Sequence, residues 1–251
     1  MVTRKKKNGI INVNRQIKEQ RTMKWGIIGA LMQEIQIIVK EMENVAVARH
    51  YDCNFYDGTI CGVRVAVAEC GVGKIRAALA AHIMIHEYGA DRIINTGVAG
   101  GVGKDLKSCD TVVSGEVIFH DVDETYNMAY PYKCRFEADG ELISLAVKSI
   151  EEITGRDAVV GRVATGDVFV DDPEVKGRIV KAVDPMCVEM EGAAIGQTAY
   201  MNGVPFVVIR SISDNAGDSA MADFEKHLER AAAVSSDIVI KMIGQSGVGK
   251  G

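Results

Sequence analysis

Short apolar runs alternate with amphipathic segments along most of the chain. The apolar runs end in small or polar residues, as buried strands do, and the segments between them carry apolar residues at helical spacing. The predicted strands cover residues 25–30, 55–60, 63–68, 92–96, 110–118, 158–167 and 205–214, and the predicted helices cover residues 31–39, 75–88, 142–153, 174–182, 192–201 and 218–242. This alternation is typical of an α/β fold with a mostly parallel, twisted central sheet and helices on both sides. The closely spaced strands near 55–68 predict a hairpin, so we expect the sheet to be mixed.

The pattern predicts one domain, residues 23–243, between two tails. Residues 1–22 are basic and show little periodicity, so we expect a disordered extension. Residues 244–251 (GQSGVGKG) come close to a phosphate-binding P-loop but lack its final Ser or Thr. We therefore expect a flexible C-terminal tail.

Composition narrows the range of partners. The net charge of −5 argues against non-specific binding to nucleic acid, which needs a basic surface. No apolar run is long and uncharged enough to span a bilayer, so we expect no membrane partner. The six cysteines are scattered without a C-x-x-C pair, which is typical of reduced thiols in a cytoplasmic protein.

Three acidic residues stand at or just beyond the ends of predicted strands: Glu34, Glu191 and Asp214. Ligands in α/β folds bind at the carboxyl edge of the sheet, so these acids can line a single pocket. Glu34 falls in the first turn of a helix, where a lone acid more often only complements the helix dipole. Glu191 follows Glu189 and Met190 in an otherwise apolar or small stretch, and a buried carboxylate needs a partner. The plainer interpretation of that stretch is a strand end with two solvated acids.

Two glycine-rich segments also follow predicted strands. The turn at 71–74 (GVGK) is a weak phosphate signal by itself, and the small residues at 97–103 (GVAGGVG) allow a ligand to approach the backbone closely. The segment at 97–103 does not form the fingerprint of a dinucleotide-binding site.

The remaining chemistry is that of carboxylates without a cofactor or metal. The chain has no Ser-His-Asp order, no cysteine in a nucleophile setting and no metal cluster. One protonated acid can donate to a leaving group while an ionised acid activates water, as in glycosidic cleavage. Hydrolysis of an N-glycosidic bond fits these parts, but the residues alone do not name a substrate.

Six motifs in order along residues 23–243 carry a close resemblance to a known family. They are residues 26–34 (GIIGALMQE), 71–74 (GVGK), 95–101 (NTGVAGG), 165–167 (TGD), 188–191 (VEME) and 210–214 (RSISD). With these motifs the chain resembles the bacterial 5′-methylthioadenosine/S-adenosylhomocysteine nucleosidases of the nucleoside phosphorylase superfamily.

The resemblance implies a hydrolase that splits methylthioadenosine or S-adenosylhomocysteine into adenine and a 5-thioribose sugar. It implies 5′-deoxyadenosine as a further candidate substrate and a role in methionine salvage. Asp214 would be the general acid that protonates adenine N7, with Ser213 orienting it. Glu34 would activate the attacking water, and Glu191 would bind the ribose hydroxyls as the C1′ cation develops.

The resemblance also implies how the substrate is held. Phe169 would stack on adenine while the Val170 backbone reads the edge of the base, and Met190 would pack under the ribose. Phe224, expected in the loop entering the last helix, would be a lid. The other implied pocket residues are Leu31, Val72, Val98, Ala99, Gly100 and Glu189, with Arg210 as the partner of Glu189.

The chain departs from the family pattern at three places. Leu31 and Val98 stand where Met and Ser are common, and the loop at 123–134 looks shorter than usual. In this family that loop contributes to a homodimer contact and to the neighbour's 5′-alkylthio pocket, so the substrate preference stays open. A phosphorolytic purine nucleoside phosphorylase and a non-catalytic nucleoside-binding protein remain the alternatives. A phosphorylase would need basic side chains or hydroxyls for phosphate, whereas a carboxylate at Glu34 repels it.

Overall fold

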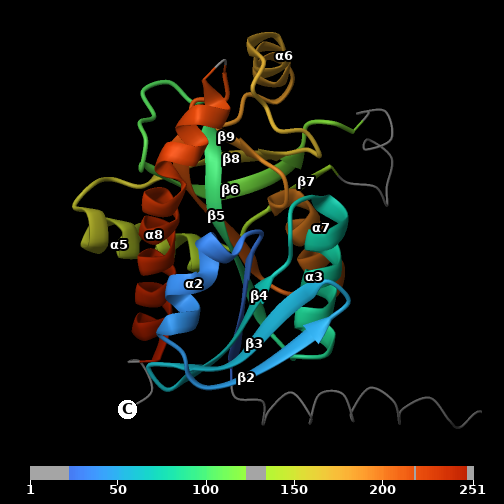
Figure 1. Cartoon of the computed structure of the whole chain (residues 1–251), viewed down its shortest axis with the longest axis vertical. Coiled ribbons are helices and arrows are strands. Elements are labelled where there is room, and N and C mark those ends of the chain that lie inside the picture. The colour runs from blue at the N-terminus through green and yellow to red at the C-terminus, as the bar shows by residue number, and fades with distance from the viewer. Residues whose placement is uncertain (1–22, 123–133, 218, 248–251) are drawn as a thin grey trace, which may run out of the picture.

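The computed structural model describes residues 23–122, 134–217 and 219–247, which form one α/β domain (Figure 1). The strands are β1 (Lys24–Gly29), β2 (Glu43–His50), β3 (Cys53–Ile60), β4 (Val63–Glu69), β5 (Arg92–Gly101), β6 (Thr111–Phe119), β7 (Arg135–Glu137), β8 (Val159–Thr165), β9 (Cys187–Glu189) and β10 (Phe206–Asp214). The helices are α2 (Met32–Lys40), α3 (Lys74–His86), α5 (Gly140–Thr154), α6 (Pro173–Val183), α7 (Gly192–Asn202) and α8 (Ala220–Gly247).

The ten strands form one mixed sheet with β5 at its centre. β5 pairs in parallel with β1 and β10, and β1 pairs in parallel with β4. Strands β3 and β2 extend this side in antiparallel order, and β3 with β4 forms the expected hairpin. On the other side the pairing runs from β10 through β6, β8 and β9 back to β5, so these five strands close into a ring.

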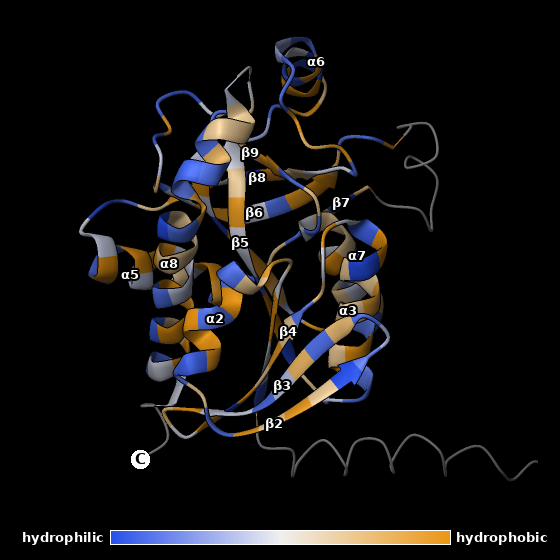
Figure 2. Cartoon of the chain, viewed as in Figure 1, coloured by the Kyte–Doolittle hydropathy of each residue, from blue (hydrophilic) through white to orange (hydrophobic). Residues whose placement is uncertain are grey.

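Helices cover both faces of the sheet (Figure 1). Alternate residues of β1 divide between the faces: Trp25 and Ile27 pack in the hydrophobic cluster with residues of α2, α5 and α8, while Ile28 packs with residues of α3 and α7. Figure 2 shows hydrophobic residues along the central strands, and both hydrophobic and hydrophilic residues on each covering helix. This two-sided burial explains why the central strands are continuous apolar runs in the sequence. None of the described helices is long and apolar enough to cross a membrane.

Three strands are absent from the predicted list: β2, β7 and the three-residue β9, whose stretch was interpreted only as a strand end. β2 is an edge strand whose residues are almost all exposed, so it has no apolar face for the pattern to reveal. β7 is only three residues long and pairs with β6 alone.

The C-terminal end of the domain also differs from expectation. α8 continues through Gly247, so residues 244–247 are helical where we expected the start of a flexible tail. Ser246 supports this last turn by donating a hydrogen bond to the Ile243 carbonyl (2.7 Å). The expected extension at 1–22, residues 248–251 and most of the loop at 123–134 lie outside the described residues.

Candidate active site

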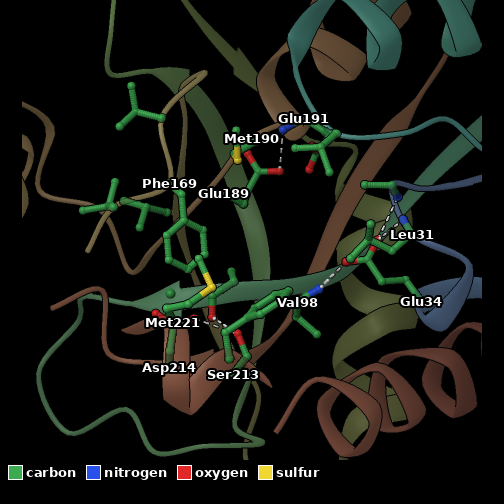
Figure 3. A pocket seen from close by; sticks show the side chains of 18 residues that line it. Leu31, Glu34, Val98, Phe169, Glu189, Met190, Glu191, Ser213, Asp214 and Met221 are labelled. Carbon is green, nitrogen blue, oxygen red and sulfur yellow. Dashed lines mark hydrogen bonds between the residues drawn. The ribbon is translucent and has the colours of Figure 1, made fainter. Parts of the chain in front are cut away.

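A pocket opens where β1, β8, β9 and β10 end, beside the last residues of β5. Figure 3 shows Phe169, Ser213 and Asp214 in one part of its wall and Glu191 and Glu34 in others. Its lining consists of Ala30, Leu31, Glu34, Val72, Val98, Ala99, Gly100, Val168, Phe169, Val170, Val188, Glu189, Met190, Glu191, Ser213, Asp214, Met221 and Phe224. The pocket is therefore mostly apolar with a few convergent acids, the usual character of a small-molecule site.

Glu34 is held by backbone N–H groups from two directions. The Ala30 and Leu31 N–H groups donate to Glu34 Oε2 (2.8 and 2.9 Å), and the Val98 N–H donates to Oε1 (2.9 Å; Figure 3). The residue lies in the first turn of α2, so it also complements the helix dipole as expected. Its side chain is only 3% exposed, yet it lines the pocket.

Glu189 ends β9 and sits under the first turn of α7. Its Oε2 accepts hydrogen bonds from the Glu191 N–H (3.1 Å) and the Gly192 N–H (2.7 Å), where the N-terminus of α7 favours a negative charge. The Thr165 hydroxyl and the Arg210 guanidinium also donate to Glu189. The predicted pairing of Glu189 with Arg210 is thus present. Together these four donors hold the Glu189 carboxylate in place.

Arg210 is a fully buried guanidinium on β10, and it faces three carboxylates. Besides Glu189 it lies 3.4 Å from Glu191 and 3.8 Å from Glu34, and it donates to Asn95 Oδ1 (2.7 Å). A Cβ at Gly97 would overlap both Arg210 and Glu34. The glycine of the 95–101 motif therefore leaves room for this ion group against β5.

Glu191 is the third acid that faces Arg210. Its Oε1 accepts a hydrogen bond from the Gly73 N–H (2.9 Å), and its Oε2 faces Arg210. Burial raises the pKa of Glu191 to about 8; the charges of Glu189 and Glu34 add to the rise, whereas Arg210 and the Gly73 N–H oppose it. One guanidinium thus faces three acids in a buried site, and this environment favours the protonated form of Glu191.

Asp214 stands apart from this group, at the end of β10. Its Oδ2 accepts a hydrogen bond from the Ser213 hydroxyl (2.8 Å) and its Oδ1 accepts one from the Ala216 N–H (2.8 Å). Burial raises the pKa of Asp214 above its usual value, while these two hydrogen bonds oppose the rise. A carboxyl group with a raised pKa and a place in the pocket wall is suited to donating a proton.

Aromatic and sulfur-containing side chains form the apolar wall near Asp214. The rings of Phe169 and Phe224 meet edge to face, with centroids 5.8 Å apart. Phe224 lies within α8 itself, so our expectation that it sits in a preceding loop was wrong. Met190 and Met221 add flexible apolar surface to the same pocket.

The structure brings together the residues predicted from the sequence. All of them line the pocket except Arg210, which lies behind the wall against Glu189. The prediction missed four lining residues: Ala30, Val168, Val188 and Met221. Ala30, Val168 and Val188 are each next to a predicted residue in the chain, so the sequence did contain a signal for them. No periodicity singles out Met221 on α8.

Comparison with known proteins identifies the family. The family model of the phosphorylase superfamily matches residues 24–244, so the chain belongs to that superfamily. Among curated relatives, a 5′-methylthioadenosine/S-adenosylhomocysteine nucleosidase of Aeromonas salmonicida is 37% identical over 230 residues, which cover 89% of this chain and 100% of the relative. A protein of the same name from Anoxybacillus flavithermus is 38% identical over 229 residues, with 89% and 99% covered.

Solved structures agree with these relatives. The nucleosidase of Neisseria meningitidis in complex with methylthio-immucillin-A has a TM-score of 0.85 and 38% identity, covering 88% of this chain and 99% of that chain. A futalosine hydrolase of Helicobacter pylori has a TM-score of 0.84 at 30% identity, with 89% and 98% covered. The two structures have nearly the same TM-score to this chain, although the enzymes are named for different nucleosides.

Removing the central guanidinium should destabilise the protein strongly. An Arg210→Met variant would leave Glu189 buried without its cation, and we expect a loss of about 3–5 kcal/mol in the free energy of unfolding. Urea denaturation measures this loss.

The matched control is Arg156→Met, because Arg156 forms an exposed pair with Asp110 at 3.0 Å. We expect this control to stay within about 1 kcal/mol of the wild type. Equal losses in the two variants would contradict the central place given to Arg210.

Proposed function

We propose that the protein hydrolyses the N-glycosidic bond of 5′-methylthioadenosine and S-adenosylhomocysteine, with release of adenine. The observation that carries the proposal is one pocket with two kinds of acid: a protonable Asp214 beside an aromatic wall, and a carboxylate group around Arg210. The names of the relatives point to the same substrates. We place the enzyme in the cytoplasm, because its six free thiols suit a reducing compartment. Its role there would be in methionine salvage.

In the proposed reaction the base lies against Phe169, and the Val170 backbone reads its edge. Asp214 donates a proton to adenine N7, which makes adenine a better leaving group. As the C1′–N9 bond breaks, positive charge develops on the ribose beside Glu191 and Glu34. A buried surplus of negative charge stabilises that cation. Glu34 takes a proton from the attacking water, whose oxygen forms the new bond to C1′.

Phosphorolysis by the same fold is the alternative reaction. A phosphate ion beside C1′ would meet the carboxylates of Glu34 and Glu191, which repel it. Lys74 of the glycine-rich turn is already paired with Asp121 (2.6 Å) and Asp167 (3.5 Å). These charges favour water as the nucleophile.

The test of the function is adenine release from methylthioadenosine with and without phosphate. We expect equal rates in both conditions, with S-adenosylhomocysteine and 5′-deoxyadenosine compared in parallel and inosine as the control substrate. Strict dependence on phosphate would identify a phosphorylase instead. Binding of methylthioadenosine without adenine release would identify a nucleoside-binding protein.

The Ser213 hydroxyl should set the pH range of the general acid. Asp214 must be protonated to act, so kcat falls as the pH rises through the pKa of Asp214. Ser213→Ala removes a hydrogen bond that lowers this pKa. The alkaline limb of the kcat profile should therefore move upward, by roughly half to one pH unit.

Ser211→Ala is the matched control, because Ser211 lies on the same strand but its hydroxyl contacts Thr111 (3.5 Å). Its pH profile should not move. A downward shift in Ser213→Ala, or the same shift in both variants, would refute the assignment.

We also propose that the enzyme is a homodimer. Exposed apolar side chains run from the pocket rim onto α3: Val72 is 47% exposed and Ile75 83%. Val168 and Met221, also at the rim, are half exposed. A second copy that covers this surface would shield the substrate's 5′ end from water.

Charge placed on this surface should separate the subunits. Ile75→Glu is expected to give a monomer in analytical ultracentrifugation, since a buried unpaired carboxylate opposes the contact. Val47→Glu, on the exposed edge strand β2, is the control and should stay dimeric. A wild-type protein that sediments as a monomer at micromolar concentration would contradict the proposal.

A further inference from the structure

Charged contacts connect the glycine-rich turn at 71–74 to the turn that follows β8. The Lys74 ammonium lies 2.6 Å from Asp121 Oδ2 and 3.5 Å from Asp167 Oδ2. The Asp167 N–H donates to the same Asp121 oxygen (2.9 Å). The turn before α3 and the turn after β8 are thus joined by charge at the edge of the pocket.

Two carboxylates accept hydrogen bonds from neighbouring backbone N–H groups at the start of α3. The Lys74 N–H donates to Asp167 Oδ1 (2.9 Å), and the preceding N–H, that of Gly73, donates to Glu191 Oε1 (2.9 Å). Gly73 has a φ of +105°, and a Cβ there would lie 3.3 Å from Asp167 Oδ1. The carboxylates of Asp167 and Glu191 thus accept hydrogen bonds from two successive N–H groups of the same turn.

We infer that Asp167 is a positioning residue for Glu191, acting through the Gly73–Lys74 backbone. This inference rests on the proposed function, in which Glu191 lies beside the ribose as positive charge develops on it. The Glu191 carboxylate accepts one hydrogen bond from the Gly73 N–H (2.9 Å) and one from Arg210 (3.4 Å), and the bond from Gly73 is the shorter. Without Asp167 the turn can rotate, and Glu191 loses the donor that aims it.

The charged groups around Glu191 indicate what the loss would do. Arg210 on β10, Glu189 on β9 and Glu34 on α2 all face it, and the two acids favour its protonated form. The Gly73 N–H favours the ionised form. Loss of this donor should therefore move the acid limb of the kcat/KM profile to higher pH.

The first experiment compares Asp167→Ala with Asp167→Asn. Asp167→Ala should lower kcat/KM for adenine release from methylthioadenosine about tenfold and shift the acid limb upward. Asp167→Asn keeps an oxygen acceptor for the Lys74 N–H and should stay within about threefold of the wild type. Asp157→Ala, in the exposed turn before β8, is the matched control and should leave both quantities unchanged.

The second experiment asks whether Asp167 acts through Glu191, with the dissociation constant of methylthio-immucillin-A as the readout. Asp167→Ala should weaken binding about tenfold in the wild-type background and hardly at all in a Glu191→Ala background. The same tenfold loss in both backgrounds would overturn the inference, as would an Asp167→Ala variant that matches the wild type. A wild-type protein that binds this probe but releases no adenine would refute the proposed function instead.

Discussion

The Arg210 guanidinium is the interaction on which the rest of the site depends. It is fully buried on β10 and faces Glu189 on β9, Glu191 at the start of α7 and Glu34 on α2. Buried charges persist only where they are paired and hydrogen-bonded. This one residue therefore allows three acids, two from the 188–191 motif and one from α2, to line the same pocket.

The imbalance of that group has a catalytic consequence. Three acids face one guanidinium in a buried place; burial raises the pKa of Glu191, and the charges of Glu189 and Glu34 add to the rise. In the proposed reaction, a cation forming on the ribose would relieve this repulsion, so the site would favour the transition state over the neutral substrate. Asp214 lies outside the group with its own hydrogen bonds, so in that reaction its proton would be available for the base.

Much of the fold and the site could be predicted from the sequence, because buried strands and their polar ends leave a local pattern. The runs before Glu34 and around Asp214 are of this kind, and both acids lie in the pocket. Contacts between distant turns leave no such pattern. The hydrogen bond from Gly73 to Glu191 joins residues 118 positions apart, and nothing near the 71–74 turn indicates it. The edge strand β2 was not predicted because neither of its faces is buried, so its sequence has no apolar pattern.

The most direct test of this account is the single-turnover rate of adenine release by Asp214→Asn. The asparagine Oδ1 can accept from the Ala216 N–H while its Nδ2 donates to the Ser213 hydroxyl oxygen, so the pocket should keep its shape. If Asp214 is the general acid, the rate should be lower by about 10²–10⁴, with the dissociation constant of methylthio-immucillin-A changed far less. A variant that released adenine at the wild-type rate would contradict this account.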